Sequence, residues 1–589
     1  MALKNIFRDE LNYLRKQGKE FARHNPKLAR TLGEQATDPD VERLIEGFAF
    51  LTAKLRKKID DDFPELTHGL IQLLWPNYLR PIPSATIIRF DPVEHAITEQ
   101  QTIPAGTELL STPVDGTACR FRTCTDVNIY PLAIQAASDS HSKQESIIFI
   151  DLKTLSQQPL NSIKCDELTF HINADDTTAM TLYLWLAKYL SSIQINIDGE
   201  TKKLGVENIS FPGFSPDDAL LPYPRNVYDG YRLLQEYFIF PQRFYFFTLQ
   251  GLRSIWPQNS SASNVQIEFH FSRPMPADFK LRTPDLSLYA TPAINLFPHD
   301  GEPITLTGKA INHRLEPSIL EPENYEIFSV DKICSWKIHQ DGGRGDFIRE
   351  FHPFASFQHE VEYSRDRSAL YYSLNIEEAV EDESLRYRIA FVRSDEIYYL
   401  GKNETVSIEM TCTNRQLPLA LGIGDISIPT EETPSFATYT NITRPTEPCR
   451  PILDGTLHWT LISNMSLNYL SLLSTDPIKA VIGAYDFSAL YNIQHARATK
   501  KRLDSIENVE TKPIDHIIKG FPVRGLKTTL SMNGDMFLCE GELYLFGTVL
   551  SHFFSLYPSI NSFHQLEIIN TSNREHYTWS IRNGKQPVI

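Results

Sequence analysis

The sequence predicts an α+β protein of several domains, with a helical N-terminal module, a β-rich, sandwich-like middle and a mixed α/β C-terminal domain. Apolar residues recur every three or four positions near both ends of the chain, which is typical of amphipathic helices. Between about residues 85 and 455 they alternate every second position, as in half-buried strands. A chain of 589 residues can bury several separate cores. We therefore predict a helical module over 1–84, β-rich parts over 85–330 and 331–455, and a mixed domain over 456–589.

The N-terminal module should contain a long amphipathic helix that begins near Asp38. Asp38 is a favourable N-cap, and Pro39 suits the first helical position. Leu44 and Leu51 widen the apolar stripe of this helix, and another stripe lies on the helix before it. The residues that we expect at a protein interface come from both stripes: Phe7, Leu14, Val41, Ile45, Phe48, Leu55 and Ile59. Such a wide face either packs within this chain or joins a helical bundle with another subunit.

The middle of the chain is predicted to consist of short strands joined by turns. Residues 86–90, 148–152 and 265–271 have strand-like patterns, and Ile103 to Thr107 reads as a turn that leads into another strand. The Ser-rich segment from Gln135 to Ser146 is expected to be a surface loop. Short strands separated by Pro, Gly, Asn and Asp are typical of sandwich domains.

Helix is predicted to return near the C-terminus. Asp476-Pro477 repeats the combination of a capping residue and a proline, and residues 542–557 are apolar enough for a buried helix. The one basic run, Lys500-Lys501-Arg502, is expected in a solvated loop. Earlier in the chain, residues 231–247 hold eight aromatic side chains. This aromatic run either fills a large core or forms an interface, and the size of the chain favours a core.

Composition argues against two classes of partner. The net charge of −16 at pH 7 disfavours a nucleic-acid binder, which needs a concentrated basic face. No run of eighteen apolar residues is present and the charged N-terminus lacks an apolar signal segment, so we predict a cytoplasmic protein without direct membrane insertion. The acidic segment from Glu377 to Glu383 is either a solvated loop or a docking patch for a basic partner.

No motif that carries chemistry stands out. The seven scattered cysteines suit a reducing compartment, and the one close pair, Cys119 and Cys124, lacks the further ligands of a metal site. Phosphate-binding, nucleophile-elbow and zinc-protease motifs are missing. Carboxylate pairs are plentiful among the 73 acidic residues, and none is distinguished from the others. We therefore predict no catalytic, cofactor-binding or metal-binding residue and no enzyme activity.

Segments spread over the whole chain match the pattern of one family. The most specific runs from Asp38 through Trp75 to Pro83, and the second is the aromatic block around Tyr237-Phe238 and Phe240-Pro241. Further matching segments are 291–297, 414–418, 459–472, 545–547 and 557–563. In this order they resemble the TssF family, the baseplate wedge subunits of type VI secretion systems. Two segments depart from the pattern, since 577–584 matches only loosely and 486–515 is unusually polar.

The resemblance implies a structural subunit without a cofactor. Two copies would assemble with one TssG, and the wedge would connect TssK, TssE with the sheath base, and the VgrG spike. The baseplate would lie in the cytoplasm, docked at the inner membrane of a Gram-negative bacterium. The N-terminal stripes would then belong to a helical bundle that joins the two copies to TssG. Two alternatives are a polysaccharide-acting enzyme rich in β-sandwiches and a secreted effector or adhesin.

Overall fold

The structure is a computed structural model, and it describes most of the chain in two compact units. One unit comprises Met1–Leu79 with Ile452–Met465, and the other comprises Arg80–Pro451 with Ser466–Ile589. The described residues are 7–8, 11, 14, 43–52, 71, 75–155, 163, 165–223, 229–256, 263–319, 321–337, 346–354, 370–378, 385–393, 399, 404–451, 453, 474–518 and 520–584. The α+β class is confirmed, and the division into four domains stays a prediction.

In the smaller unit, helix is described at residues 7–8, 11, 14, 43–52 and 71. A short 3₁₀ turn, η2 (Pro76–Tyr78), follows, with proline at its start. The rings of Phe7 and Phe50 meet edge to face with their centroids 6.4 Å apart. The predicted cap at Asp38 lies outside the described residues.

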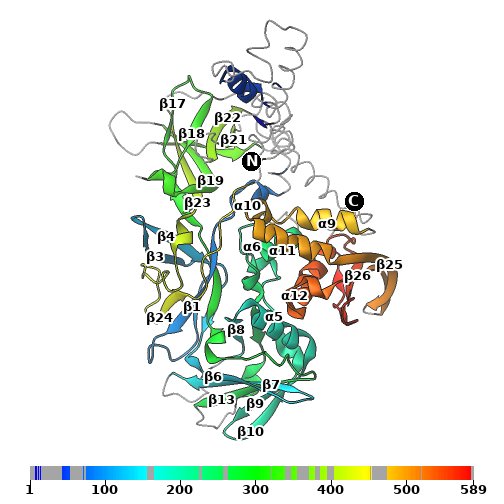
Figure 1. Cartoon of the computed structure of the whole chain (residues 1–589). Helices are drawn as coiled ribbons and strands as arrows, with labels where there is room; N and C mark the ends of the chain where they lie inside the picture. The colour runs from blue at the N-terminus through cyan, green and yellow to red at the C-terminus, as the bar shows by residue number, and fades with distance from the viewer. Residues whose placement is uncertain are drawn as a thin grey trace. The chain divides into compact units, whose positions relative to one another are not determined.

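Two five-stranded sheets and one four-stranded sheet form the first part of the larger unit (Figure 1). One sheet has the order β24 (Ala437–Asn441), β1 (Ala85–Pro92), β15 (Ala290–Ile294), β4 (Thr117–Thr123) and β3 (Glu108–Val114). The second has the order β10 (Glu200–Leu204), β9 (Leu190–Ile197), β13 (Asn264–Phe271), β7 (Ser146–Thr154) and β6 (Leu132–His141). The third has the order β11 (Ile209–Ser210), β12 (Phe246–Leu249), β8 (Leu168–Ile172) and β14 (Leu286–Leu288), and β2 (Gln101–Ile103) pairs with β5 (Val127–Ile129).

These sheets confirm the three strands predicted at 86–90, 148–152 and 265–271. They also show that the loop predicted from Gln135 to Ser146 is wrong over most of its length. Strand β6 extends to His141 and pairs antiparallel with β7, so only a short turn separates the two strands. Because β6 is an edge strand with one solvent-facing side, it tolerates the serines and aspartate that suggested a loop.

An eight-stranded sheet forms a second β-rich part of the larger unit. Its main path is β16 (Phe297–Asp300), β23 (Glu404–Thr413), β19 (Glu326–Lys337), β20 (Asp346–Pro353), β21 (Leu370–Glu378), β22 (Leu385–Arg393) and β18 (Asn312–Leu315), and β17 (Ile304–Leu306) pairs with β23. Strands β19 and β23 pair along ten positions and bury Ile333, Val406 and Ile408 in the core of this sheet. Glu377 and Glu378 end β21, and the rest of the acidic segment lies outside the described residues.

The C-terminal part combines helices with a mixed sheet, as predicted. Its helices are α9 (Thr475–Gly483), α10 (Ser488–Tyr491), α11 (Ile493–Asp504) and α12 (Glu540–Phe554). Its strands are β25 (Ile506–Ile518), β26 (Phe521–Met532), β27 (Phe563–Asn570), β28 (His576–Thr578) and β29 (Arg582–Asn583). Strands β26 and β27 are parallel, which requires a crossover, and α12 provides it.

One prediction for this part is wrong, because Lys500, Lys501 and Arg502 lie on helix α11 instead of in a loop. The Asn492 side chain caps α11 by accepting hydrogen bonds from the N–H groups of Gln494 and His495. A helix with so few apolar residues gives a weak periodic signal, so its sequence resembles a solvated segment.

Helix α12 packs against two helices of the middle region, α5 (Asp176–Leu184) and α6 (Asp229–Ile239) (Figure 1). Aromatic rings fill the space between α6 and the C-terminal part. Tyr231 stacks on Tyr485 with ring centroids 5.0 Å apart, and Tyr237 lies 5.5 Å from Phe546. The eight aromatic residues of the 231–247 run are all buried, so the prediction that this run fills a core is confirmed.

Candidate functional site

An apolar stripe is exposed on the N-terminal helix at residues 43–52. Leu44, Phe48 and Leu51 are spaced at i, i+4 and i+7, and their exposed fractions are 74%, 60% and 59%. This spacing places the three side chains on one face. Ala49, on another face of the same helix, is fully buried. Large apolar side chains gathered on one exposed stripe mark a surface that binds another apolar surface.

The predicted interface residues are only partly placed by the structure. Phe48 is exposed, as an interface residue should be, whereas Ile45, Phe7 and Leu14 are half-buried. Val41, Leu55 and Ile59 lie outside the described residues. Leu44 and Leu51 share the exposed stripe with Phe48. They were not among the predicted interface residues, although their spacing from Phe48 can be read in the sequence. The assignment of these residues to an interface therefore stays a prediction.

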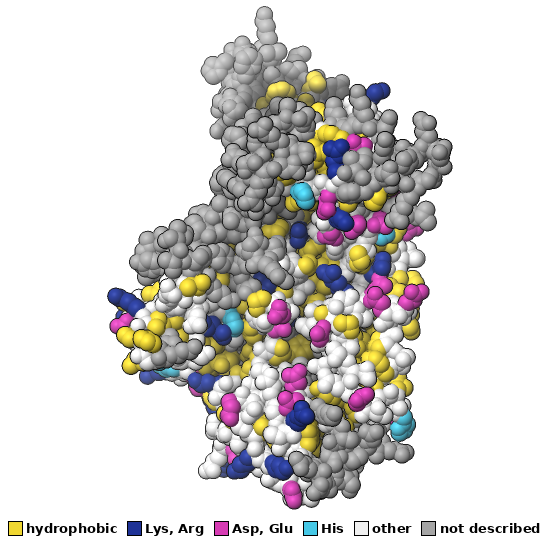
Figure 2. Space-filling model, turned by 180° about the vertical axis from the view of Figure 1, so that it is seen from behind, with side chains coloured by type: hydrophobic (Ala, Val, Ile, Leu, Met, Phe, Trp, Pro, Cys, Tyr) yellow, Lys and Arg dark blue, Asp and Glu magenta, His cyan; other side chains and the backbone are white. Residues whose placement is uncertain are grey.

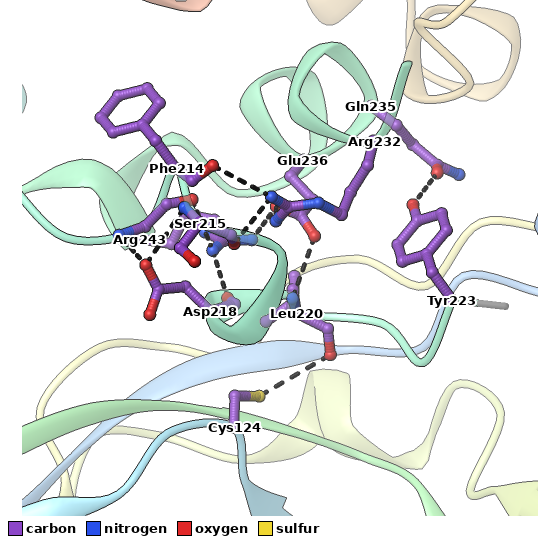
Figure 3. A network of polar contacts seen from close by, with 11 residues as sticks. Cys124, Phe214, Ser215, Asp218, Leu220, Tyr223, Arg232, Gln235, Glu236 and Arg243 are labelled. Carbon is purple, nitrogen blue, oxygen red and sulfur yellow. Dashed lines mark hydrogen bonds and ion pairs between the residues drawn. The ribbon is translucent and has the colours of Figure 1, made fainter. Parts of the chain in front are cut away.

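A buried network of charged residues lies inside the aromatic run of the larger unit. Arg232 and Glu236, one helical turn apart on α6, form an ion pair with 3.0 Å between Nη1 and Oε2. Arg243, from the 3₁₀ turn η7 (Pro241–Phe244), pairs with the same carboxylate oxygen. All three side chains are at most 1% exposed. Figure 3 shows both guanidinium groups directed at Glu236 and at the segment around Ser215 and Asp218.

This network attaches residues 213–220 to α6. The Arg232 Nη2 atom donates to the Ser215 carbonyl oxygen at 2.9 Å, and the Arg243 Nη2 atom donates to the Gly213 carbonyl oxygen at 3.0 Å. The second carboxylate oxygen of Glu236 accepts from the N–H group of Leu220 at 2.9 Å. Buried polar groups that are paired in this way hold a segment with only one short 3₁₀ turn, η6 (Pro216–Asp218), in one conformation.

The network has two cations and one anion. Burial, together with repulsion from Arg232, lowers the pKa of Arg243 to about 9, so this side chain is still protonated at neutral pH. The charge of the nearby Asp218 opposes this lowering of the Arg243 pKa, and backbone carbonyl oxygens accept hydrogen bonds from both guanidinium groups. The network is consequently built to fix the geometry of the 213–220 segment.

Other ionisable groups of the core are held in their uncharged forms. Burial raises the pKa of Cys119 to about 11 and that of Cys412 to about 12. Burial also lowers the pKa of His564 to about 3. A thiol reacts as its thiolate and a buried neutral imidazole does not exchange protons near pH 7, so these groups act as packing residues. In the part of the chain that the structure describes, no cluster of His, Cys, Asp and Glu is arranged to hold a metal ion, and all seven cysteines are free.

A pocket of about 490 Å³ bears on the enzyme alternative. Glu323, Glu326, Arg415 and Arg450 are among the residues that line it. Burial raises the pKa of Glu326, while the charges of Arg415 and Arg450 oppose that shift. Arg415 also donates from Nη1 to the Glu323 carbonyl oxygen at 2.8 Å. A glycosidase requires two carboxyl groups that flank the scissile bond of the substrate. In this pocket, the charges that act on Glu326 are those of Arg415 and Arg450.

Charge is distributed without a single dominant sign over much of the surface. On the face drawn in Figure 2, basic and acidic side chains are interspersed among apolar ones. Among the described residues, no helix combines the length and apolar character needed to cross a bilayer.

The smaller unit thus exposes an apolar stripe, and the larger unit combines extensive sheets with a buried charge network that fixes its backbone. A family-wide sequence profile described as type VI secretion system, TssF, matches residues 1–586. The chain belongs to the TssF family, which confirms the resemblance seen in the sequence. It is 28% identical to the type VI secretion system component TssF1 of Pseudomonas aeruginosa over an alignment of 630 residues that covers 99% of each protein.

Two solved structures share the fold. A chain of the type VI secretion system TssK–TssF–TssG baseplate subcomplex is 29% identical with a TM-score of 0.77, covering 93% of this chain and 99% of that one. A chain of the baseplate complex from the type VI secretion system is 26% identical with a TM-score of 0.67, and both chains are fully covered. Members of this family are thus subunits of the type VI secretion baseplate, found in complexes with TssK and TssG.

Proposed function

We propose that this chain is a non-enzymatic wedge subunit of a type VI secretion baseplate, assembling as two copies with one TssG. The observation that carries the proposal is the exposed stripe of Leu44, Phe48 and Leu51. Membership of the TssF family supports it, as does the likeness to a chain from a complex that contains TssG. The stripe would bury its apolar side chains in a helical bundle formed with TssG and the second copy.

The exposed area of the stripe is sufficient to make a measurable contribution to binding. Full burial of a leucine or phenylalanine side chain stabilises by about 1.5–3 kcal/mol. Scaled by the exposed fractions, the three side chains would supply roughly 3–6 kcal/mol before the cost of association. A charged group in the centre of the stripe should therefore weaken the complex strongly.

The wider connections follow from the same assignment. The wedge would link TssK, TssE with the sheath base, and the VgrG spike, and it would act in the cytoplasm at a baseplate docked on the inner membrane. Its mechanism would be mechanical, because a rigid-body change in the wedge can pass a change of baseplate shape to the sheath. The sheets and the buried Arg232–Glu236–Arg243 network provide the stiffness that such a role requires.

The test is co-purification of TssG with a variant of the stripe. Phe48→Asp should reduce the recovery of TssG at least tenfold, while the yield of folded chain is unchanged. Phe521→Asp is the matched control, because Phe521 is a phenylalanine of similar exposure, at 74%, at the end of a strand in the larger unit. Native mass spectrometry of the wild-type complex should give two copies of this chain for each TssG.

Two results would contradict the proposal. Equal recovery of TssG with Phe48→Asp and with Phe521→Asp would show that the stripe does not contact TssG. A wild-type chain that is purified from its native cells as a monomer, without TssG or TssK, would remove the wedge assignment and make substrate screens the next step.

A further inference from the structure

Helix α11 carries a basic stripe on its exposed face. Ile493, Arg497, Lys500 and Lys501 are spaced at i, i+4, i+7 and i+8, so they share one side of the helix, and all four are exposed. The opposite side holds the helix in place, because Thr499 is buried and the Arg502 Nε atom pairs with Glu542 of α12 at 2.7 Å. Helix α11 is thus fixed on one side and open to a partner on the other.

The three cations of this stripe repel one another. No ion pair joins Arg497, Lys500 or Lys501 to an acidic side chain in the described part of the chain. Like charges three and four residues apart destabilise a helix. The cluster also runs against the composition of the chain, whose net charge is −16. Asp504 lies one turn after Lys500 on the same helix, but no ion pair joins the two side chains in the described part of the chain. An acidic partner would relieve the repulsion that remains.

Exposed apolar side chains adjoin the basic stripe at its N-terminal end. Leu490, Tyr491 and Ile493 are exposed by 46%, 52% and 71%, and they lie on α10 and at the first residue of α11. From Ile493 to Lys501 the helix rises about 12 Å. The surface therefore has an order along the helix, with an apolar end and a basic end.

We propose that this surface, the α10–α11 face, binds an acidic segment of a partner protein. The apolar side chains of that segment lie against Leu490, Tyr491 and Ile493, and its carboxylates lie against Arg497, Lys500 and Lys501. A protein segment fits better than a nucleic acid or an anionic membrane, because three cations beside an apolar end match a short amphipathic sequence, while the charge of −16 repels an extended polyanion. The α10–α11 face belongs to the larger unit and is independent of the N-terminal stripe.

The experiment uses the full-length chain and two labelled peptides of identical composition. One peptide has a leucine-rich half followed by a glutamate-rich half, and the other has the same residues evenly interleaved. Fluorescence anisotropy at low salt should show the segregated peptide binding at least tenfold more tightly. Raising the ionic strength should weaken that binding, because salt screens the charge pairs.

Variants assign the binding to the α10–α11 face. Arg497→Gln, Lys500→Gln and Lys501→Gln combined keep good helix formers and should weaken binding of the segregated peptide at least tenfold. The matched control replaces three other exposed lysines, Lys143, Lys153 and Lys280, with glutamine, which changes the net charge equally and should leave binding unchanged. Ile493→Ser tests the apolar end separately and should weaken binding several-fold.

Three outcomes would overturn the proposal. Equal binding of the two peptides would reduce the surface to unspecific charge attraction. Binding of vesicles containing phosphatidylglycerol, lost in the glutamine variant while the peptide fails to bind, would assign the face to a membrane. Self-association in sedimentation velocity that the glutamine variant abolishes, again without peptide binding, would assign it to a second copy of this chain. None of these outcomes bears on the TssG test, which uses residues of the other unit.

Discussion

Replacing Glu236 by glutamine should disrupt the buried charge network while leaving its shape almost unchanged. Glutamine keeps an oxygen that can accept from the Leu220 N–H group, so the main loss is the negative charge between Arg232 and Arg243. Both guanidinium groups would then lose the buried carboxylate that they share. Removing one partner of a buried ion pair typically costs about 3–5 kcal/mol.

The loss of stability should be concentrated in residues 213–220, the segment that the network holds. The carbonyl oxygens of Gly213 and Ser215 would keep their arginine donors only if the two cations stayed in place against their mutual repulsion. Because unfolding of a multidomain chain is not two-state, a local measurement is required. Hydrogen–deuterium exchange of peptides covering residues 211–223 and 231–247 reports the free energy of local opening.

A matched control shows how much of the effect comes from losing a negative charge that is not fully buried. Glu575 forms a partly exposed ion pair with Arg273, with 2.8 Å between the atoms and side chains exposed by 27% and 40%. Glu575→Gln should change protection of its own region by less than about 1 kcal/mol. If Glu236→Gln also changed protection by less than about 1 kcal/mol, the argument that the network holds the 213–220 segment would be refuted.

Two further changes test packing and protonation in the C-terminal part. At Gly541 of α12, an added Cβ would lie 2.1 Å from the carbonyl oxygen of Met180 on α5. Gly541→Ala should therefore lower the free energy of unfolding by about 1–3 kcal/mol and accelerate hydrogen–deuterium exchange in α12. Unchanged exchange in α12 would contradict this close approach. Burial keeps His564 neutral by lowering its pKa from 6.5 to about 3 in the folded chain. Between these two pH values only the unfolded chain binds the proton, so the free energy of unfolding should fall as the pH drops below 6.5. At pH 5 this group should lower the free energy of unfolding by about 2 kcal/mol relative to pH 7, which hydrogen–deuterium exchange in β27 at the two pH values measures. His564→Gln should reduce this difference between pH 7 and pH 5.

The elements that the sequence predicted are those whose periodicity is set by burial. Strand β1 has a row of fully buried residues at Ile87, Ile88 and Phe90, and α12 is buried over most of its length, so both patterns were readable. Strand β6 and helix α11 were missed because their exposed sides are polar, and polarity is also the mark of a loop. Strand β6 is held by hairpin pairing with the next strand, β7, and α11 by the cap of Asn492, and neither contact leaves an apolar periodicity in the sequence.

The candidate site was predictable to a similar extent. The aromatic run was recognised as core, but Arg232, Glu236 and Arg243 within it look like ordinary surface charges in a sequence. The readable signal was an i, i+4 pair of opposite charges enclosed by apolar residues on both sides, which is unexpected on a solvent-facing helix side. The third member, Arg243, joins through the 3₁₀ turn after Pro241, and that geometry depends on the tertiary fold.

A buried charge network is a costly way to gain stability, since an apolar replacement of similar volume is often as stable or more stable. Apolar side chains, however, cannot donate hydrogen bonds to the carbonyl oxygens of residues 213–218, which would then be buried without partners. The network therefore serves to fix a segment whose regular structure is limited to the short 3₁₀ turn η6 (Pro216–Asp218). In the wedge role that we propose, the network would keep the shape of the 213–220 segment, while the exposed apolar stripe of the N-terminal helix would stay available for TssG.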